Sequence, residues 1–329
     1  MMDDLSPQTI ASRGYYALSA RWRKLFGRPA RKIPLDAGFN CPNRDGTIST
    51  GGCAFCNAKG SGSGLGDGMD LAAQWEHWRA RRLAKWGDVA LVAYLQAFSN
   101  THGPASRLKT VLDCIAPLPG LSGLCLGTRP DCLDSEKLDI LAAFPTRELW
   151  LELGLQSSNP ATLARVNRGH GPDCFASAVT EAAARGIKVV AHVMAGLPGE
   201  TPKDWSASVD FVNDLPVAGI KFHNFLVVRG APLADEYAAQ AGTPVRDVPG
   251  AGMGALPDLA EYAQWVADSL ARLRPDIVVH RLSADPLHDE LVAPAWAGDK
   301  RKVHQAILDA LARGNVRQGM LWNAVPKKS

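Results

Sequence analysis

The sequence predicts an α/β fold in which a parallel sheet forms a barrel covered by helices. Apolar strand-like runs alternate with helix-like segments at intervals of about thirty residues, the repeat of right-handed βαβ units. Several predicted strands also end in polar or glycine-rich tips, and in a parallel barrel the carboxyl ends of the strands form the mouth that holds the active site. An open doubly wound sheet is less favoured, because no Gly-x-Gly-x-x-Gly motif follows any predicted strand.

Each element follows from its local pattern. Short apolar runs predict buried strands at about residues 31–39, 88–98, 123–128, 148–155, 187–194, 219–228 and 277–282. Helical periodicity and N-cap residues predict helices at about residues 71–86, 104–115, 202–215, 258–273 and 300–313, with three more after Asp134, Asn159 and Gly171. The polar strand tips are residues 96–103, 127–131, 152–158 and 196–200.

Composition indicates a globular protein with one sizeable core. The 329 residues are 46% hydrophobic and 21% charged, and the net charge of +3 decides little about partners. Asp3 and Asp4 stand where a secretion signal would need bases, and no apolar run is long enough to span a membrane. Seven cysteines in a reducing compartment argue against a disulfide framework. We therefore expect a cytoplasmic protein with no membrane association.

The N-terminal segment is basic and aromatic. Between Leu5 and Leu35 there are seven bases and no acid, and Tyr15, Tyr16, Trp22 and Phe26 lie among them. Such a pattern suits a nucleic acid, since cations neutralise phosphates and rings stack on bases. The alternative is an amphipathic helix that packs its aromatic residues inward.

Three cysteines stand close together in a predicted loop. Cys41, Cys53 and Cys56 lie within sixteen residues, and turn-forming residues separate them. Three thiolates fit a four-iron cluster with one open iron, or zinc completed by another ligand, and a Cys-x-x-Cys pair also suits dithiol redox chemistry. From spacing, the iron–sulfur cluster ranks first, zinc second and dithiol chemistry third. The other four cysteines are expected to be small buried hydrophobes: Cys114, Cys125, Cys132 and Cys174.

The cysteine loop resembles that of the YhcC-like proteins of the radical S-adenosylmethionine (SAM) superfamily, which are related to the catalytic subunit of Elongator. Eleven residues separate the first two cysteines, as in this subgroup, whereas the commonest radical SAM loop has three. The resemblance continues in order through residues 95–101, 128–133, 152–157, 167–170, 196–201, 219–223 and 280–282. It implies a partial (β/α)6 TIM-like barrel over residues 31–240, with an N-terminal extension over residues 1–30 and a C-terminal extension over residues 241–329.

The resemblance also implies a cofactor site. Cys41, Cys53 and Cys56 would bind three irons of a [4Fe-4S] cluster, and SAM would chelate the fourth. The positions that match SAM contacts are Asn100, Thr101, Thr128, Glu152, Gln156, Arg168, His192 and Gly196. The usual Gly-Gly-Glu form of the second-strand motif is absent, and His192 stands where some relatives have an aspartate.

Some of these polar residues have structural interpretations as well. Glu152 and Gln156, four apart on one strand, could form a buried hydrogen-bonded pair, and Arg168 could serve a helix C-terminus before Gly169. His223 and His280 could line the substrate side or be satisfied structural groups.

The expected activity is reductive cleavage of SAM to a 5′-deoxyadenosyl radical that abstracts hydrogen from a substrate, with an electron donor such as flavodoxin or ferredoxin. A tRNA wobble-uridine side chain is the first candidate substrate. A small metabolite or protein substrate is the second, and a zinc-binding RNA-binding module without turnover is the third.

Overall fold

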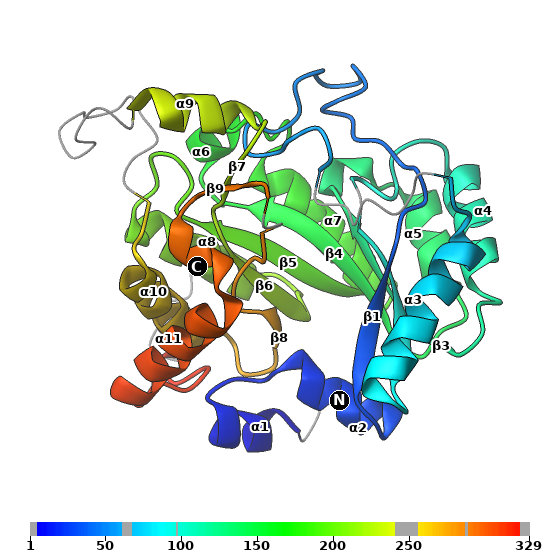
Figure 1. Cartoon of the computed structure of the whole chain (residues 1–329), viewed down its shortest axis with the longest axis horizontal. Helices are drawn as coiled ribbons and strands as arrows, with labels where there is room; N and C mark the ends of the chain where they lie inside the picture. The colour runs from blue at the N-terminus through cyan, green and yellow to red at the C-terminus, as the bar shows by residue number, and fades with distance from the viewer. Residues whose placement is uncertain (1–4, 61–67, 97, 241–255, 287–288, 323–329) are drawn as a thin grey trace.

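The computed structural model describes residues 5–60, 68–96, 98–240, 256–286 and 289–322. Asp3, Asp4 and the expected boundary at residue 241 lie outside these ranges. Seven parallel strands form one sheet in the order β1-β2-β3-β4-β5-β6-β8 (Figure 1). They are β1 (Ala30–Leu35), β2 (Ala90–Leu95), β3 (Leu121–Thr128), β4 (Leu149–Gln156), β5 (Lys188–Ala195), β6 (Gly219–Asn224) and β8 (Val278–Arg281).

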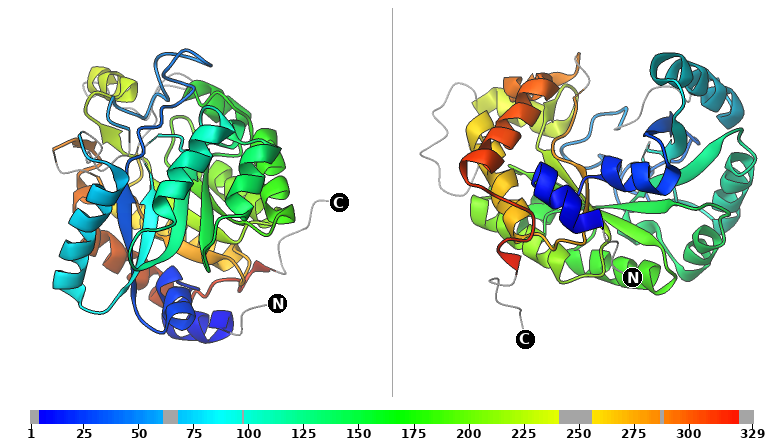
Figure 2. Two further views of the ribbon diagram at one scale, coloured as in Figure 1. Left: turned by 90° about the vertical axis from the view of Figure 1, so that its right-hand side faces the viewer. Right: turned by 90° about the horizontal axis from the view of Figure 1, so that it is seen from below.

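Helices cover the outer face of the curled sheet, and the view from below in Figure 2 shows them as an arc around it. They are α3 (Leu71–Trp86), α4 (Ala105–Ile115), α5 (Ser135–Ala142), α7 (Pro172–Ala184), α8 (Pro202–Asn213), α10 (Leu259–Arg272) and α11 (Lys300–Arg313). Helices α6 (Pro160–Arg165) and α9 (Pro232–Gln240) lie at the top of Figure 1. Helices α1 (Leu5–Arg13) and α2 (Leu18–Phe26) lie across the lower end of the barrel. No helix in the described ranges combines the length and apolar character needed to cross a bilayer.

The predicted partial barrel is confirmed, and besides the six strands β1 to β6 its sheet includes the strand expected at residues 277–282. Strand β8, from the C-terminal segment, pairs with β6. The expected strand over residues 219–228 is divided in two. Strand β6 ends at Asn224, and β7 (Val227–Val228) leaves the sheet to pair antiparallel with β9 (Leu291–Ala293). The sequence does not reveal this break, because no Gly or Pro stands between Ile220 and Val228.

Of the two interpretations of the N-terminal segment, inward packing of the rings holds for three of its aromatic residues. Tyr15, Tyr16 and Trp22 are all buried. Ala17 forms a parallel bridge with Val279 of β8, and the Val279 amide donates to the Tyr16 carbonyl at 2.8 Å. The segment thus pairs with the edge strand β8, and these three rings are not available for stacking on nucleobases.

The strands divide the barrel interior into layers, because side chains two apart point to the same face. On β4, Trp150, Glu152 and Gly154 follow one another toward the carboxyl end. Trp150 belongs to an apolar cluster inside the barrel that includes Trp22. A second, larger core fills the space between the sheet and the outer helices. The mouth of the barrel therefore lies above a charged layer at Glu152, which rests on an apolar floor.

Candidate active site

The loop that follows β1 crosses the carboxyl ends of the strands, at the top of Figure 1. Its thiols Cys41, Cys53 and Cys56 line a cavity of about 160 Å³ at the barrel mouth. The strand tips form the opposite wall. The cysteine loop and the polar strand tips therefore lie together at the barrel mouth, as expected. Residues of β2 to β5 or the turns after them that line this cavity are Tyr94, Gln96, Phe98, Ser99, Gly127, Thr128, Arg129, Glu152, Gly154, Gln156 and His192.

Cys53 lies in an environment that favours a thiolate. The Arg168 Nη1 and Asn43 Nδ2 atoms each lie 3.5 Å from its Sγ, and the Arg129 Nη1 lies 4.0 Å from it. A hydrogen bond from Cys56 and the two guanidinium charges outweigh burial and lower the pKa of Cys53 to about 5. The same hydrogen bond, together with burial, raises the pKa of Cys56 well above its usual value. A cationic, partly buried site with three thiols suits thiolate ligation.

The arrangement of the thiols differs from a single-ion site. Within the described ranges, no three or more His, Cys, Asp or Glu side chains are grouped so that they could hold one metal ion. A zinc ion would draw its sulfur ligands to about 2.3 Å from one point. An iron–sulfur cluster binds each thiolate at a different iron, so three thiols around one cavity can be further apart. Three thiols around one cavity thus fit a cluster that takes each thiolate at a different iron.

Five of the eight residues matched to SAM contacts line the cavity with the cysteines. One of them, Arg168, connects the cysteine loop to the tip of β4. Its Nη2 donates to the Gly154 carbonyl at 2.7 Å, while its Nη1 faces Cys53. The side chain thus joins the loop to the tip of β4 rather than serving a helix C-terminus. The five residues are Thr128, Glu152, Gln156, Arg168 and His192.

The other three lie outside the cavity lining. Thr101 is one layer behind it, with its hydroxyl 2.7 Å from that of Thr128. Asn100 is fully buried and donates its side-chain amide to the Gly127 carbonyl at 2.8 Å. Gly196 packs against Pro257, where an added Cβ would come within 2.9 Å of the proline ring. Their contact with SAM stays a prediction.

Gly154 is required by the close approach of two polar side chains. A Cβ at this position would lie 2.5 Å from Arg168 Nη2 and 2.7 Å from Gln156 Nε2. Gln156 itself has a φ of 72°, where the pairing of β4 with β5 is irregular. The bulge turns the Gln156 side chain into the cavity and not toward Glu152.

Glu152 is bound to cations and not to Gln156. Its Oε1 lies 2.6 Å from Lys32 Nζ, and its Oε2 accepts a hydrogen bond from Lys221 and lies 3.3 Å from His192 Nε2. Burial alone would raise the pKa of Glu152, but Lys221 and Lys32 together hold it well below its usual value. Burial lowers the pKa of Lys221 to about 7. The attraction of Glu152 opposes this shift, and repulsion from Lys32 and Arg281 adds to it. The alternative interpretation of a Glu152–Gln156 pair is therefore wrong, and the carboxylate forms the centre of a buried ion network.

Three histidines around this network are held neutral. Burial is the main cause in each case: it lowers the pKa of His192 to about 4 and those of His223 and His280 well below the usual value. Below the ordinary histidine pKa of about 6.5, the unfolded chain therefore binds protons that the folded protein does not.

The free energy of unfolding is accordingly expected to fall as the pH decreases from about 7 to about 5. Each histidine contributes up to about 1.4 kcal/mol per pH unit. Urea unfolding at several pH values measures it. His192→Asn should flatten the dependence, whereas His77→Asn, on α3, should leave it unchanged. A wild-type stability that stays constant over this range would contradict the assignment.

Sequence reasoning did not single out several residues of the site. Asn43 is fully buried, faces Cys53 and bonds the Asn167 carbonyl at 2.6 Å. Arg129 faces Cys53 and is fixed by Asp131 at 2.6 Å. Tyr94 lines the cavity and accepts a hydrogen bond from Lys221 at 3.0 Å. Arg129 stands in a polar strand tip, which was the available signal, whereas Tyr94 is hidden in an apolar strand.

Comparisons with known proteins agree with this geometry. The model of the radical SAM superfamily matches residues 43–212, and the radical SAM C-terminal domain matches residues 217–313. The chain is 34% identical to the uncharacterised protein YtqA of Bacillus subtilis over 100% of this chain and 99% of that protein. It is 32% identical to the protein YhcC of Escherichia coli over 84% of this chain and 85% of that protein.

More distant relatives share part of the chain. A tRNA uridine(34) acetyltransferase of Dehalococcoides mccartyi is 33% identical over 37% of this chain and 27% of that protein. The structure of Elp3 from Methanocaldococcus infernus, with an N-terminal deletion, superposes with a TM-score of 0.62 at 15% identity, and the match covers 76% of this chain and 62% of Elp3. That likeness shows the fold. With a full-length relative and a family model over more than half of its residues, the chain belongs to the radical SAM superfamily of enzymes, among the homologues of YhcC and YtqA.

Proposed function

We propose that the protein binds a [4Fe-4S] cluster and SAM at the barrel mouth and acts as a hydrogen-abstracting radical SAM enzyme. The observation that carries the proposal is the cavity in which three cysteine thiols, Arg168 and the tip of β4 meet. When bound, the cluster would supply the electron that reductively cleaves SAM to methionine and a 5′-deoxyadenosyl radical, which takes a hydrogen atom from the substrate.

The chain's own residues bind, orient and shield in this proposal. Cys41, Cys53 and Cys56 would hold three irons, and Gln156 and Arg168 lie where they could contact SAM. The ion network around Glu152 closes the inner side of the cavity that holds the cysteines. Its charged groups are already paired with one another, and they would separate the bound SAM from solvent on that side. A small protein such as flavodoxin or ferredoxin would deliver the electron. All seven cysteines are free, as a reducing cytoplasmic compartment requires.

The substrate that we propose is tRNA, at a wobble-uridine side chain. The partial match to a tRNA uridine(34) acetyltransferase supports it, as does the basic N-terminal segment. On α2, Arg23 and Lys24 are exposed, whereas Arg21 bonds Glu148 at 3.0 Å. With the three rings turned inward, contact through this helix would be mainly with phosphates. The modest net charge of +3 favours the second candidate, a small metabolite or a protein.

Replacing Arg23 and Lys24 by glutamine is expected to weaken tRNA binding several-fold at low salt and to reduce its salt dependence, because two phosphate contacts are lost. Filter binding over a range of salt concentrations measures this. Lys109→Gln, on α4 where Lys109 pairs with Asp113, serves as the control. The modified nucleosides of tRNA from a deletion strain complete the test. An unchanged nucleoside profile would count against tRNA and favour a small substrate.

A further inference from the structure

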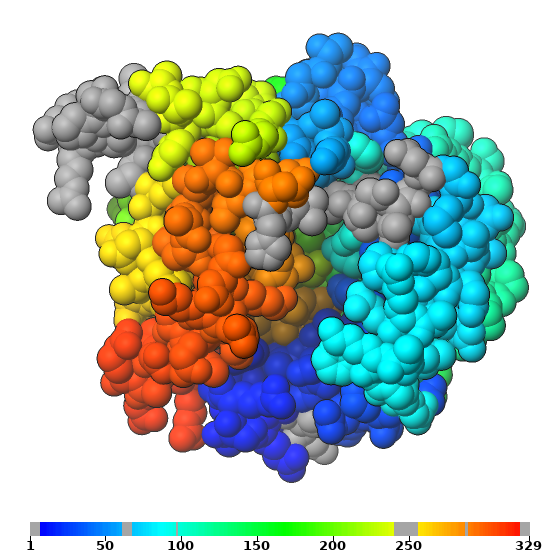
Figure 3. All heavy atoms as spheres, in the orientation of Figure 1, coloured from blue at the N-terminus to red at the C-terminus, as the bar shows by residue number. Residues whose placement is uncertain are grey.

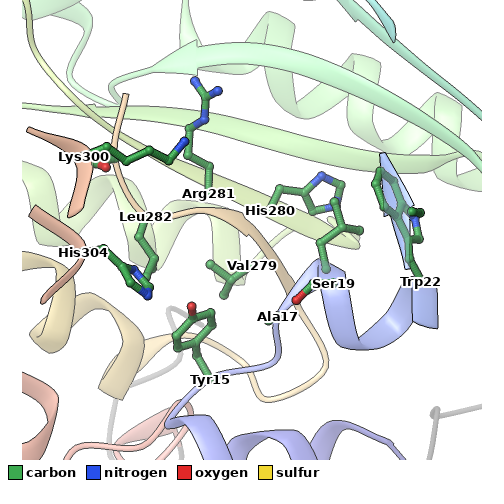
Figure 4. Close-up of a pocket in the computed structure, with 13 residues that line it drawn as sticks. Tyr15, Ala17, Ser19, Trp22, Val279, His280, Arg281, Leu282, Lys300 and His304 are labelled. Atoms are coloured by element: carbon green, nitrogen blue, oxygen red, sulfur yellow. The ribbon is translucent and has the colours of Figure 1, made fainter. Parts of the chain in front are cut away.

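A second cavity of about 370 Å³ opens at the side of the barrel, away from the cysteines. It lies between β8, α2 and the start of α11 (Figure 4). This is the side on which the sheet is not closed, since β1 and β8 are its two edge strands. In Figure 3 the surface is hollowed on this face, between the C-terminal segment in orange and α3 in cyan. The cavity thus gives access to the barrel interior from the side.

The walls of this cavity are cationic. Arg281 and Lys300 share one carboxylate: Lys300 Nζ lies 2.6 Å from Asp285, and Arg281 Nη2 lies 3.6 Å from it, beyond hydrogen-bonding distance. His304 adds a third basic side chain to the lining. Figure 4 shows Lys300 extending toward Arg281, while Tyr15 and His304 face each other at the opposite end. Two permanent cations with one carboxylate leave a positive charge that a ligand can neutralise.

The inner wall holds a polar side chain, His280, which packs edge-on against Trp150. The imidazole of His280 is fully buried, and neither of its nitrogens makes a hydrogen bond to any described residue. Its ring lies between Trp22 and Arg281 in the lining of the cavity. The ring has no accessible surface, so it closes the cavity on its inner side and leaves Arg281 and Lys300 as the side chains that a ligand would meet.

His280 also connects the side cavity to the barrel mouth. Its Nδ1 lies 4.0 Å from Glu152 Oε1, and Glu152 lines the cavity that holds the cysteines. On the other side of the network, the charge of Arg281 is close enough to lower the pKa of Lys221 and of His223. A group held at Arg281 would therefore lie next to His280, behind the layer that closes the cysteine cavity.

We propose that the side cavity formed by His280, Arg281 and Lys300 binds an oxyanion, a carboxylate or a phosphate, of the group on which the enzyme acts. Arg281 supplies a guanidinium that can bind either anion through two hydrogen bonds, and Lys300 supplies a charge at the rim. The inference rests on the proposed function, because it places the substrate at the open side of the barrel. Anion binding itself requires neither cluster nor turnover.

Calorimetric titration of the purified protein with inorganic phosphate, and separately with acetate, tests the site. Wild-type protein is expected to bind at least one of them, and the tighter of the two identifies the source of the oxyanion. Arg281→Gln and Lys300→Gln should each weaken binding about tenfold, the loss of one charge-assisted contact of about 1.4 kcal/mol. Lys300 is largely exposed, so its variant should fold normally. Lys302→Gln, two residues along α11 and exposed, is the matched control and should bind as the wild type does.

The outcomes separate the two proposals. No binding to wild-type protein, binding unaffected by both variants, or equal loss in the Lys302→Gln control would overturn the anion site. Formation of 5′-deoxyadenosine by reconstituted wild-type protein is measured in parallel. Its absence would overturn the proposed function and leave the titration result standing.

Discussion

Replacing Cys53 by alanine is expected to abolish iron and sulfide loading and to lower the formation of 5′-deoxyadenosine from SAM by at least a thousandfold. Cys53 is the thiol on which Arg168, Arg129 and Asn43 converge, and it is the one whose pKa falls to about 5. Only the thiolate binds iron, so the lowered pKa of Cys53 favours the form of this side chain that acts as a ligand. Iron and sulfide analysis, the visible spectrum and chromatography of the nucleoside product measure the effect.

Cys114→Ala is the matched control, because this thiol is exposed on α4 and does not line the cavity. The expectation of four small buried cysteines is confirmed for Cys125 and Cys132 and is wrong for Cys114, which is exposed, and for Cys174, which is half-buried. The Cys114→Ala variant should load iron and release 5′-deoxyadenosine as the wild type does. Anaerobically purified wild-type protein that is colourless and contains zinc would contradict the cluster. So would a Cys53→Ala variant that retains the full iron and sulfide content.

The cysteines and the strand tips could be found from sequence because the information is local. A loop with Cys41, Cys53 and Cys56 needs only spacing and turn formers to be recognised. The position of a polar tip follows from the end of an apolar run, and barrel topology brings such tips together. For this reason Thr128 and Gln156 do line one cavity with the thiols. Arg168 follows α6 and was found from the family resemblance instead.

The features that sequence reasoning missed depend on long-range partners. The alternative pairing of Glu152 with Gln156 rested on their spacing of four residues on one strand, yet the partners of Glu152 are Lys32 and Lys221, 120 and 69 residues away. The bulge after Gly154, which turns Gln156 away, leaves no sign in the apolar pattern of β4. Likewise, the direction of Tyr16 and Trp22 was decided by β8, a strand that follows them by more than two hundred residues.

Replacing Glu152 by glutamine is expected to lower the free energy of unfolding by about 3–5 kcal/mol, because it leaves buried Lys32 and Lys221 without their counter-charge. The loss is a large part of the 5–15 kcal/mol typical of a folded domain. Lys221→Met should also destabilise, but the double variant Glu152→Gln/Lys221→Met should lose less than the sum of the two. A coupling of about 1–3 kcal/mol is expected for residues in direct contact. Urea unfolding of all four proteins measures it.

Glu76→Gln is the control for a charge removed from the surface. Glu76 pairs with Arg79 on α3, and both side chains are substantially exposed, so the change should be at most about 1 kcal/mol. The experiment also separates two roles for Glu152. If this carboxylate serves the ion network, stability falls whether or not SAM is present. If it serves only as a SAM contact, Glu152→Gln would unfold like the wild type and lose only its affinity for SAM. That result would show that the inner wall of the cavity does not depend on the ion network.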